Sequence, residues 1–340
     1  MFIGQRTVYL AAVALVLTFA SIGSSSAAGL ANKPEVGEFI NEMVTQHGFK
    51  QNELETLFNQ VKIKQKILDA ISRPAEKSKP WYEYRKIFLT EKRINNGVRF
   101  WQENADIIDY AEQIYGVAPE IMVAIIGVET YYGRLQGKYL VMDALATLAF
   151  GYPKRSKFFR SELKYFLIMS QEQQFDPLSK KGSYAGAMGM GQFIPSSYQH
   201  YAIDFNGDGK KNIWDDNVDA IGSVANYFKR HGWEKSQPVA DLVSLNTDTS
   251  LSENDACKRS CKPTQSVADF KQKGVQGKTQ VDDKSPAILL ILGQKGGKEY
   301  WLGYNNFYTI SRYNHSTLYS MAVYQLSQEI KQAYRAINKS

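Results

Sequence analysis

The sequence predicts a mainly α protein of the α+β class, in which a helical chain carries one small β insertion. Apolar residues recur every three or four positions over residues 36–115 and again over 316–336, which is the period of an amphipathic helix. Residues 234–297 are polar and lose this period, but they contain the apolar run 287–292 followed by the turn Gly296–Gly297. A buried strand, a tight turn and a second strand are therefore expected within the insertion.

The first 28 residues have the composition of an export signal. Arg6 precedes an apolar run over 9–22, and the small residues at 24–28 fit cleavage by a signal peptidase after Ala28. The run is shorter than the ~20 residues that span a bilayer, so we favour a cleaved signal peptide over an uncleaved anchor. Because no cysteine lies near the cleavage site to accept a lipid, the mature chain is expected to be soluble and periplasmic.

The rest of the chain divides by composition into helical and β-rich parts. After an N-terminal helical region, Pro119 favours the first turn of a new helix. The expected divisions are a signal peptide over 1–28, helices over 29–115, a helical core over 116–233, the β insertion over 234–300 and a return to the core over 301–340.

The chain of 340 residues has 41 Lys and Arg residues against 34 Asp and Glu residues, a formal net charge of +7, and many aromatic residues (5 Trp, 21 Tyr and 17 Phe). A basic surplus raises the question of nucleic acid. The basic residues are scattered and no nucleic-acid motif is recognisable, so we expect no nucleic-acid partner. Net charge also keeps proteins soluble, and attraction to an anionic cell wall is the more specific interpretation.

The only two cysteines, Cys257 and Cys261, lie close together in a polar stretch. In an oxidising compartment a local disulfide is the preferred interpretation, and closing so short a loop adds about 2 kcal/mol at best. A metal site is the alternative, but neither a histidine nor a third cysteine lies nearby.

A single carboxylate stands in a long apolar segment. If this segment is one helix, Glu129 shares a face with Met122 and Ile126. Burial disfavours the charged form and raises the pKa of a carboxyl group, and a tenfold change in the ionisation equilibrium corresponds to about 1.4 kcal/mol. A carboxylic acid kept protonated near neutrality is what a general acid needs at a glycosidic oxygen. The alternative is a structural glutamate buried against Arg134 or a helix end.

A glycine-rich segment over 182–198 follows later in the chain. Its glycines let the backbone approach a ligand closely or adopt positive φ. Ser183 and Gln192 add a hydroxyl and an amide that can bind sugar hydroxyl and acetamido groups. A phosphate-binding loop is the competing interpretation, but no lysine follows the glycines and no strand is predicted before them.

These two segments resemble the lytic murein transglycosylase B family, which has a lysozyme-like core. The resemblance begins with Gly127–Thr130 and Gly186–Tyr198, and it covers most of the mature chain while thinning between about 235 and 285. It implies a lysozyme-like helical core with additional N-terminal helices and the small β insertion. Further matching stretches are Met142–Phe150, Asp219–Phe228 and Asn306–Thr317.

The family resemblance implies cleavage of the β-1,4 bond between N-acetylmuramic acid and N-acetylglucosamine in peptidoglycan, with a 1,6-anhydromuramoyl end and no net addition of water. Glu129 matches the family's catalytic acid, which protonates the leaving oxygen and then, as a carboxylate, takes the proton of the attacking C6 hydroxyl group. The sequence offers no convincing second carboxylate, because Asp143 at the start of a helix is better explained as a cap or structural residue. A hydrolytic muramidase and a non-catalytic peptidoglycan-binding protein are the alternatives.

Further residues match family positions that contact glycan. Aromatic faces pack on sugar rings while the tyrosine hydroxyl remains available, although a single tyrosine more often serves ordinary packing. We expect a monomer that binds the glycan strands of peptidoglycan. The predicted glycan contacts are Tyr84, Ser183, Gln192, Tyr227, Tyr313, Asn314 and Tyr319.

Residues 204–215 follow the template of an EF-hand calcium loop. Oxygen-bearing side chains stand at positions 1, 3 and 5, glycine at 6 and a carboxylate at 12, and position 7 would contribute its backbone carbonyl. Position 12 is an aspartate rather than the longer glutamate, and position 8 is Lys211, so the aspartate at 219 is the rival final ligand. A polar turn is the alternative, and zinc is disfavoured because the histidines are not at ligand spacing. The predicted ligands of this structural Ca²⁺ are Asp204, Asn206, Asp208, Lys210, Asp215 and Asp219.

Overall fold

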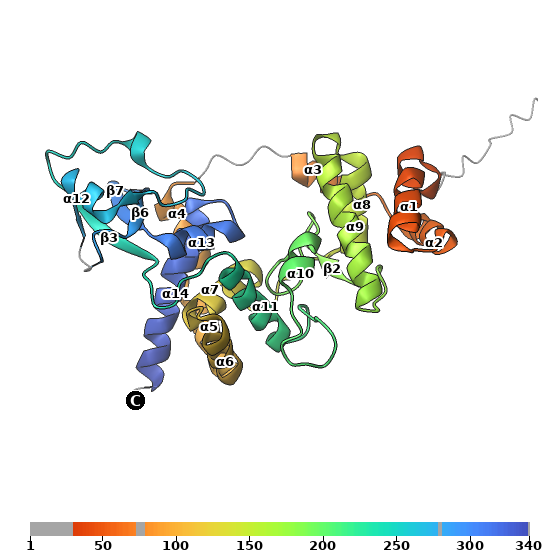
Figure 1. Cartoon of the computed structure of the whole chain (residues 1–340), viewed down its shortest axis with the longest axis horizontal. Coiled ribbons are helices and arrows are strands. Elements are labelled where there is room, and N and C mark those ends of the chain that lie inside the picture. Colours follow the sequence, from red (N-terminus) through yellow and green to blue (C-terminus); the bar gives the residue numbers. More distant parts are fainter. Residues whose placement is uncertain (1–29, 73–78, 278–280, 339–340) are drawn as a thin grey trace, which may run out of the picture. The chain divides into compact units, whose positions relative to one another are not determined.

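The computed structural model describes residues 30–72, 79–277 and 281–338. The chain forms two compact units, Met1–Gln60 and Val61–Ser340, and each is described by itself. Helices dominate both units and a five-stranded sheet lies in the second, which confirms the predicted fold class (Figure 1). The predicted signal peptide over 1–28 lies outside the described residues.

The first unit packs two helices through their apolar faces. Its elements are η1 (Leu30–Asn32), α1 (Pro34–His47) and α2 (Gln51–Gln60). Helix α1 has a proline in its first turn and ends at Gly48, where a φ of 71° lets the N–H donate back to the carbonyl of Met43. Phe39 of α1 meets Phe58 of α2 edge to face, with ring centroids 5.9 Å apart.

The second unit is helical around one central helix, α7. Among the described residues, no single helix is both long and apolar enough to cross a membrane; α6 and α7 pass that test together but are bent by 115°. The helices of this unit are α3 (Gln65–Ser72), α4 (Trp81–Phe88), α5 (Glu91–Glu103), α6 (Ala105–Tyr115), α7 (Pro119–Thr130), α8 (Val141–Gly151), α9 (Ser156–Glu172), α10 (Pro195–Tyr201), α11 (Asn217–Arg230), α12 (Val267–Gln272), α13 (Asn305–Tyr313) and α14 (Thr317–Asn338), with 3₁₀ turns η2 (Pro153–Arg155) and η3 (Glu253–Asp255).

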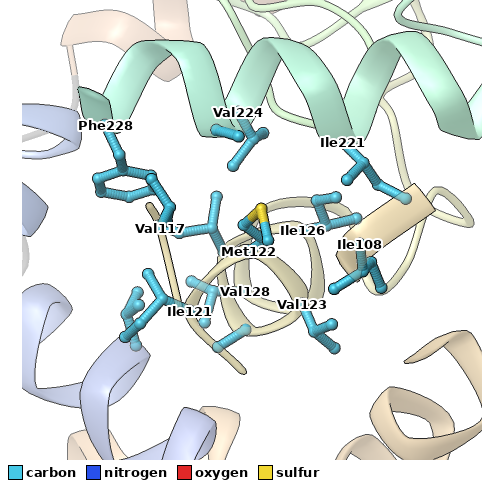
Figure 2. Close-up of a cluster of buried hydrophobic side chains, with 14 of the residues drawn as sticks. Ile108, Val117, Ile121, Met122, Val123, Ile126, Val128, Ile221, Val224 and Phe228 are labelled. Atoms are coloured by element: carbon cyan, nitrogen blue, oxygen red, sulfur yellow. The ribbon is translucent and has the colours of Figure 1, made fainter. Parts of the chain in front are cut away.

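Helix α7 is covered on every side. Neighbours α5, α6, α11 and α14 contact it, and Figure 2 shows Ile221, Val224 and Phe228 of α11 beside its apolar side chains. Every residue of α7 except Glu129 is buried. Burial therefore extends well beyond the face that Glu129 shares with Met122 and Ile126, and a helix that is apolar all round is buried on all sides.

The β insertion is an antiparallel sheet with the strand order β4-β6-β7-β3-β5. The predicted apolar strand is part of β6, and the predicted glycine turn joins it to β7, with Gln294 paired to Gly297. β3 was not predicted, because Asp241 and Ser244 interrupt its apolar residues and its burial does not alternate. A separate two-stranded ribbon pairs β1 with β2. The strands are β1 (Tyr139–Leu140), β2 (Lys181–Gly182), β3 (Ala240–Leu245), β4 (Gln265–Ser266), β5 (Val275–Gly277), β6 (Pro286–Gln294) and β7 (Gly297–Gly303).

One apolar cluster joins the sheet to the helices, and we call it the sheet cluster. Strand β6 contributes three of its side chains, and helices α4, α13 and α14 contribute four more. Burial of large apolar side chains stabilises a fold by about 1.5–3 kcal/mol each, so this cluster is a substantial tie between the insertion and the helices. The sheet cluster contains Trp81, Ile288, Leu290, Leu292, Phe307, Met321 and Ala322, together with Ala240 of β3.

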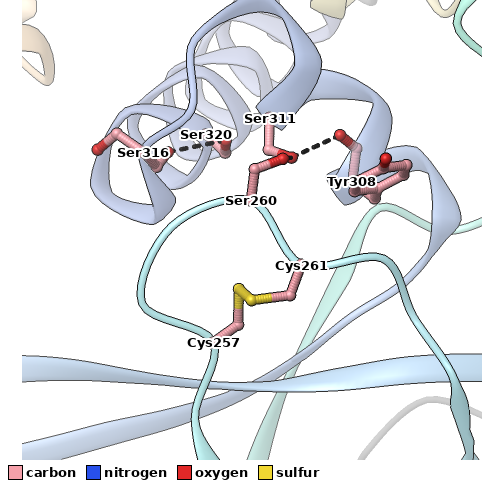
Figure 3. The surroundings of a disulfide bond; sticks show 7 residues. All are labelled: Cys257, Ser260, Cys261, Tyr308, Ser311, Ser316 and Ser320. Atoms are coloured by element: carbon pink, nitrogen blue, oxygen red, sulfur yellow. Dashed lines mark hydrogen bonds between the residues drawn. A yellow bond between two sulfur atoms is a disulfide. The ribbon is translucent and has the colours of Figure 1, made fainter.

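Cys257 and Cys261 form the expected disulfide, with Cα atoms 5.8 Å apart (Figure 3). The N–H of Cys257 donates to the carbonyl of Leu289 on β6 at 2.8 Å, and both cysteines pack against the sheet cluster. Between them, Ser260 shares a hydrogen bond of 2.6 Å with Ser311 of α13. The cross-linked loop therefore bridges the sheet and α13.

Replacing both cysteines (Cys257→Ser with Cys261→Ser) should lower the free energy of unfolding by about 2 kcal/mol, because the loop that the disulfide closes is short. Urea denaturation measures this loss. Wild-type protein treated with a reductant is the matched control and should lose a similar amount. An unchanged midpoint in both samples would show that the cross-link is dispensable.

Candidate active site

Glu129 lies in the last turn of α7, at the point where the helix is forced to end. The next two residues outside the helix, Tyr131 and Tyr132, adopt left-handed φ values of 54° and 61°. Such a conformation costs a non-glycine residue of order 1 kcal/mol or more and is typical of functional sites. The ring of Tyr132 folds back over Gly127, where an added Cβ would come within 2.6 Å of it. The glycine two residues before Glu129 is thus required by this close approach.

Thr130 ties the end of α7 to the glycine-rich loop. Its buried hydroxyl donates to the carbonyl of Met190 at 2.8 Å and accepts the N–H of Gly133 at 3.0 Å. Removing a buried hydroxyl would leave both partners unsatisfied, at a cost of about 1–3 kcal/mol. The hydrogen bond holds Glu129 and the loop in a fixed relation.

The glycine-rich loop is folded tightly on itself and on the core. Met188 and Phe193 exchange backbone hydrogen bonds of 2.8 and 2.9 Å. At Gly189, φ is 68° and a Cβ would meet the carbonyl of Ile213 at 2.6 Å, so no side chain fits there. The loop's close packing against its neighbours therefore depends on this glycine.

The carboxyl group of Glu129 accepts a short hydrogen bond from the hydroxyl of Tyr319 on α14. Burial raises the pKa of Glu129 to about 7, and the hydrogen bond from Tyr319 acts in the opposite direction. Arg134, the alternative partner considered from the sequence, instead lies over the ring of Tyr131, with 5.8 Å between the guanidinium carbon and the ring centroid. Glu129 is thus a lone carboxyl group beside a tyrosine.

Two more of the predicted tyrosines lie near Glu129. Burial, and then the charge of Glu129, raise the pKa of both Tyr84 on α4 and Tyr313 on α13. Tyr313 also donates its hydroxyl to the carbonyl of Gly191 in the glycine-rich loop. Three helices therefore bring their tyrosines to one carboxyl group.

The other predicted glycan contacts occupy different environments. Ser183 and Gln192 are partly buried in the loop, where Ser183 accepts the N–H of Ala187 at 3.0 Å. Tyr227 is buried, and its hydroxyl donates to the carbonyl of Arg312 at 2.7 Å, so its hydroxyl already has a partner within the protein. Asn314 is exposed at the end of α13.

Gln136 is a residue of this region that the sequence did not single out. Its side-chain amide donates to the carbonyl of Trp214 at 2.8 Å, while its backbone carbonyl accepts from the side chain of Gln192 at 3.2 Å. Gln136 therefore links the glycine-rich loop to Trp214, near the end of the EF-hand-like loop. No spacing pattern marks this residue, because its partners lie far away in the chain.

Asp143 is engaged elsewhere. It is buried in α8, accepts the N–H of Lys62 at 2.9 Å and lies 3.4 Å from the ammonium group of Lys64. Asp143 is therefore a structural residue that binds the segment before α3.

The EF-hand-like loop is folded around its own aspartates. Asp204 accepts the N–H groups of Gly207 and Gly209 at 2.7 and 2.8 Å, and Asp208 accepts that of Lys210 at 2.8 Å. Asn206 accepts the N–H of Asp208 at 2.9 Å. Within the described residues, no group of three or more His, Cys, Asp or Glu side chains is arranged to hold a metal ion.

The two candidates for the last calcium ligand differ sharply. Asp219 is fully buried, and its two carboxylate oxygens accept the N–H groups of Phe205 and Asn212 at 2.8 and 2.7 Å. Asp215 is 76% exposed and lies 4.0 Å from the ammonium group of Lys180. Asp219 therefore organises the loop from beneath, while Asp215 points outward.

A family model and a related protein both match most of this chain. The family model described as Transglycosylase SLT domain matches residues 31–328. The chain is 45% identical over 309 residues to the membrane-bound lytic murein transglycosylase B of Escherichia coli (strain K12), covering 88% of this chain and 83% of that protein.

Solved structures agree with this match. The catenated lytic transglycosylase SltB1 from Pseudomonas aeruginosa superposes with a TM-score of 0.85 at 50% identity, covering 89% of this chain and 98% of that one. The Escherichia coli lytic transglycosylase Slt35 in complex with calcium gives 0.82 at 45% identity, over 90% and 95%. SltB3 from Pseudomonas aeruginosa in complex with NAG-anhNAM-pentapeptide gives 0.78 at 30% identity, over 86% and 78%.

The opposing effects on Glu129 can be separated by measurement. Replacing Tyr319→Phe removes the hydrogen bond that stabilises the carboxylate, so the pKa of Glu129 should rise above about 7. An NMR titration of the labelled glutamate carboxyl groups reads the value directly. Tyr324→Phe, one turn or so further along α14, is the control and should leave that pKa unchanged. A lower pKa in Tyr319→Phe would contradict the assigned direction.

Proposed function

We propose that this chain, which belongs to the Transglycosylase SLT domain family and is a peptidoglycan lytic transglycosylase, uses Glu129 as its single catalytic acid and base. The bond cleaved is the β-1,4 bond between N-acetylmuramic acid and N-acetylglucosamine. The observation that carries this proposal is a lone, partly buried carboxyl group with a pKa of about 7 at the end of α7.

A carboxyl group with this pKa is suited to two successive proton transfers. Near neutral pH, both its protonated and its ionised forms are well populated, and general acid–base catalysis works best when the pKa lies near the working pH. Glu129 in its acid form protonates the oxygen of the leaving N-acetylglucosamine as the bond to the anomeric carbon breaks. The acetamido group of the muramic acid stabilises the positive charge on that carbon.

The second transfer closes the product ring. Glu129, now a carboxylate, takes the proton of the muramic acid C6 hydroxyl group while that oxygen bonds to the anomeric carbon. The glutamate returns to its acid form, and the strand ends in a 1,6-anhydromuramoyl group with no water added. No second carboxylate is needed for this sequence, which agrees with the engagement of Asp143 elsewhere.

The predicted glycan contacts would hold the glycan in place. Ser183, Gln192 and Asn314 offer polar groups on partly buried or exposed side chains. Tyr84 and Tyr313 offer aromatic faces, against which sugar rings pack. Tyr227 supports this surface from behind, because its ring lies 4.7 Å from that of Tyr313. A relative was solved with NAG-anhNAM-pentapeptide, and we propose that strands carrying peptide bind along these residues of this chain too.

Glu129→Gln tests the assignment of the acid. The variant should release soluble products from purified sacculi at a rate about 100- to 10,000-fold below wild type, because an amide cannot donate or accept the proton. Mass spectrometry of wild-type products should show ends one water lighter than reducing ends, and wild-type activity should decline above pH 7 as Glu129 ionises. Exposed Glu103→Gln is the charge-matched control and should retain full activity. Undiminished digestion by Glu129→Gln would remove this residue from the mechanism, and reducing ends would indicate hydrolysis.

Calcium is the second part of the proposal, supported by the calcium complex of the related Slt35. The donors in the loop are all oxygens, which suits this hard cation. We propose that Asp204, Asn206 and Asp208 bind it through their side chains and Lys210 through its carbonyl. Asp215, at position 12 of the loop, closes the site, because Asp219 is fully buried beneath the loop. The role of the ion is structural.

Calcium should raise the melting temperature of the wild-type protein, with a stabilisation of about 2.7 kcal/mol at 100 times the dissociation constant. Differential scanning calorimetry with and without a chelator measures the shift. Asp208→Asn should need more calcium for the same shift, because the amide keeps an oxygen ligand but loses a charge, and it should melt like wild type in chelator. Asp219→Asn should melt lower even in chelator, because two loop N–H groups depend on it. Identical calcium responses in wild type and Asp208→Asn would exclude this site.

The cell-wall enzyme is further proposed to work in the periplasm as a soluble protein. The composition of the first 28 residues and the disulfide between Cys257 and Cys261 support export to an oxidising compartment. The Escherichia coli relative is named membrane-bound, whereas both cysteines of this chain are engaged with each other.

A further inference from the structure

A small basic pocket lies beside the glycine-rich loop, and the proposed reaction does not use it. Its volume is about 180 Å³, and we call it the lysine pocket. Three lysines line it, no acidic residue does, and aromatic rings form part of its wall. The lining side chains that carry the argument are Lys180, Lys210, Lys211, Phe175 and Trp214.

Lys180 is held across the aromatic wall. Its ammonium nitrogen lies 4.9 Å from the ring centroid of Trp214 and 5.7 Å from that of Phe175, and its side chain remains 25% exposed. A lysine in this position keeps its charge over the ring faces through cation–π attraction. The ammonium group of Lys180 is therefore held at the wall of the pocket.

The backbone around Lys211 is fixed from both sides. Its N–H donates to the side chain of Gln173 at 2.8 Å, and its carbonyl accepts from the hydroxyl of Tyr198 at 2.7 Å. Trp214, in turn, donates its indole N–H to the carbonyl of Lys181 at 3.1 Å. The pocket is thus built on ordered backbone, which reduces the entropy lost when a ligand binds.

The positive charge of the pocket is only partly matched. The carboxylate of Asp215 lies 4.0 Å from Lys180, but it is 76% exposed and stands outside the lining. A pocket lined by three lysines and no acidic residue attracts an anion, and concave surfaces with one sign of charge focus this attraction.

The pocket is connected to the proposed glycan contacts through the chain and through hydrogen bonds. Strand β2 begins one residue after Lys180, and Ser183 follows it directly, so the Cα atoms of Lys180 and Ser183 are at most about 10 Å apart. From the other side, Gln192 bonds to Gln136, which bonds to the carbonyl of Trp214. The pocket is therefore adjacent in the chain to Ser183 and linked through hydrogen bonds to Gln192, the two proposed sugar contacts.

We propose that the lysine pocket binds a carboxylate of the peptide that the muramic acid carries, and that it makes the enzyme prefer peptide-bearing strands. This inference rests on the proposed function, because it takes the glycan strand to lie along Ser183 and Gln192. The peptide is the anionic part of that substrate and is attached to it, so its effective concentration at the pocket is high. The aromatic wall packs against the aliphatic parts of the peptide.

The test compares two substrates for each enzyme variant. Uncross-linked glycan strands with their peptides, and the same strands after an amidase has removed the peptides, are cleaved under identical conditions, and the ratio of the two kcat/KM values is the readout. Lys180→Gln should lower this ratio about threefold to fivefold, and Lys180→Gln with Lys211→Gln about tenfold, since a partly exposed charge pair contributes up to about 1 kcal/mol. Lys181→Gln is the matched control, because Lys181 is the exposed neighbour on β2 and does not line the pocket.

Each outcome bears on a different statement. A wild-type enzyme that cleaves neither substrate contradicts the proposed function itself. If wild type cleaves both and the double variant keeps the wild-type ratio, the lysine pocket does not bind peptide. If the ratio falls equally in Lys181→Gln, the effect comes from the net charge of the surface and not from the pocket, which also overturns the inference.

Discussion

Helix α7 is packed on all sides by α5, α6, α11 and α14, and its last turn carries the one side chain of the helix that is not buried. A helix held in this way cannot rotate or slide without opening the core, so the position of Glu129 is fixed by the packing of the helices around α7. The left-handed conformations of Tyr131 and Tyr132 then turn the chain away at once. The rest of the site is arranged around this fixed point: Thr130 anchors the glycine-rich loop to it, and α14 delivers Tyr319.

The electrostatic state of Glu129 results from two effects of opposite sign. Enclosure by apolar neighbours penalises the carboxylate, and the tyrosine hydroxyl stabilises it. A second carboxylate in contact would push the pKa further up, and a nearby arginine would pull it down. The arrangement of one acid and one hydroxyl donor keeps the group near the middle of the physiological range, where it can both give and take a proton.

Much of the fold could be predicted, and the reasons are local. The helical period, the glycine turn before β7 and the apolar run of β6 depend on neighbouring residues in the chain. The pairing of the two cysteines could also be predicted, since they are close in sequence. Strand β3 could not be predicted from the sequence, because its buried and exposed residues do not alternate. It is held in place by pairing with β7 and β5.

The candidate site was predictable only where a motif marks it. Glu129 and the glycine-rich loop stand out by composition, whereas Gln136 and Thr130 act through partners more than fifty positions away. The glycan contact of Tyr227 stays a prediction, and the bond of its hydroxyl to the carbonyl of Arg312, 85 positions further on, is marked by no motif. The lysine pocket had no signal at all, because its lysines belong to two segments that meet only in the folded chain.

The sheet cluster has a consequence for how small such an enzyme can be made. Trp81 starts the helix that carries Tyr84, and Met321 and Ala322 follow Tyr319 by less than one turn. Both helices rest on β6, so the insertion serves as the foundation of two tyrosines that face the acid. Excising it to obtain a minimal catalytic domain would strip the support from both. The edge strands β4 and β5 contribute no side chain to the sheet cluster, whereas β6 contributes three and has to be kept.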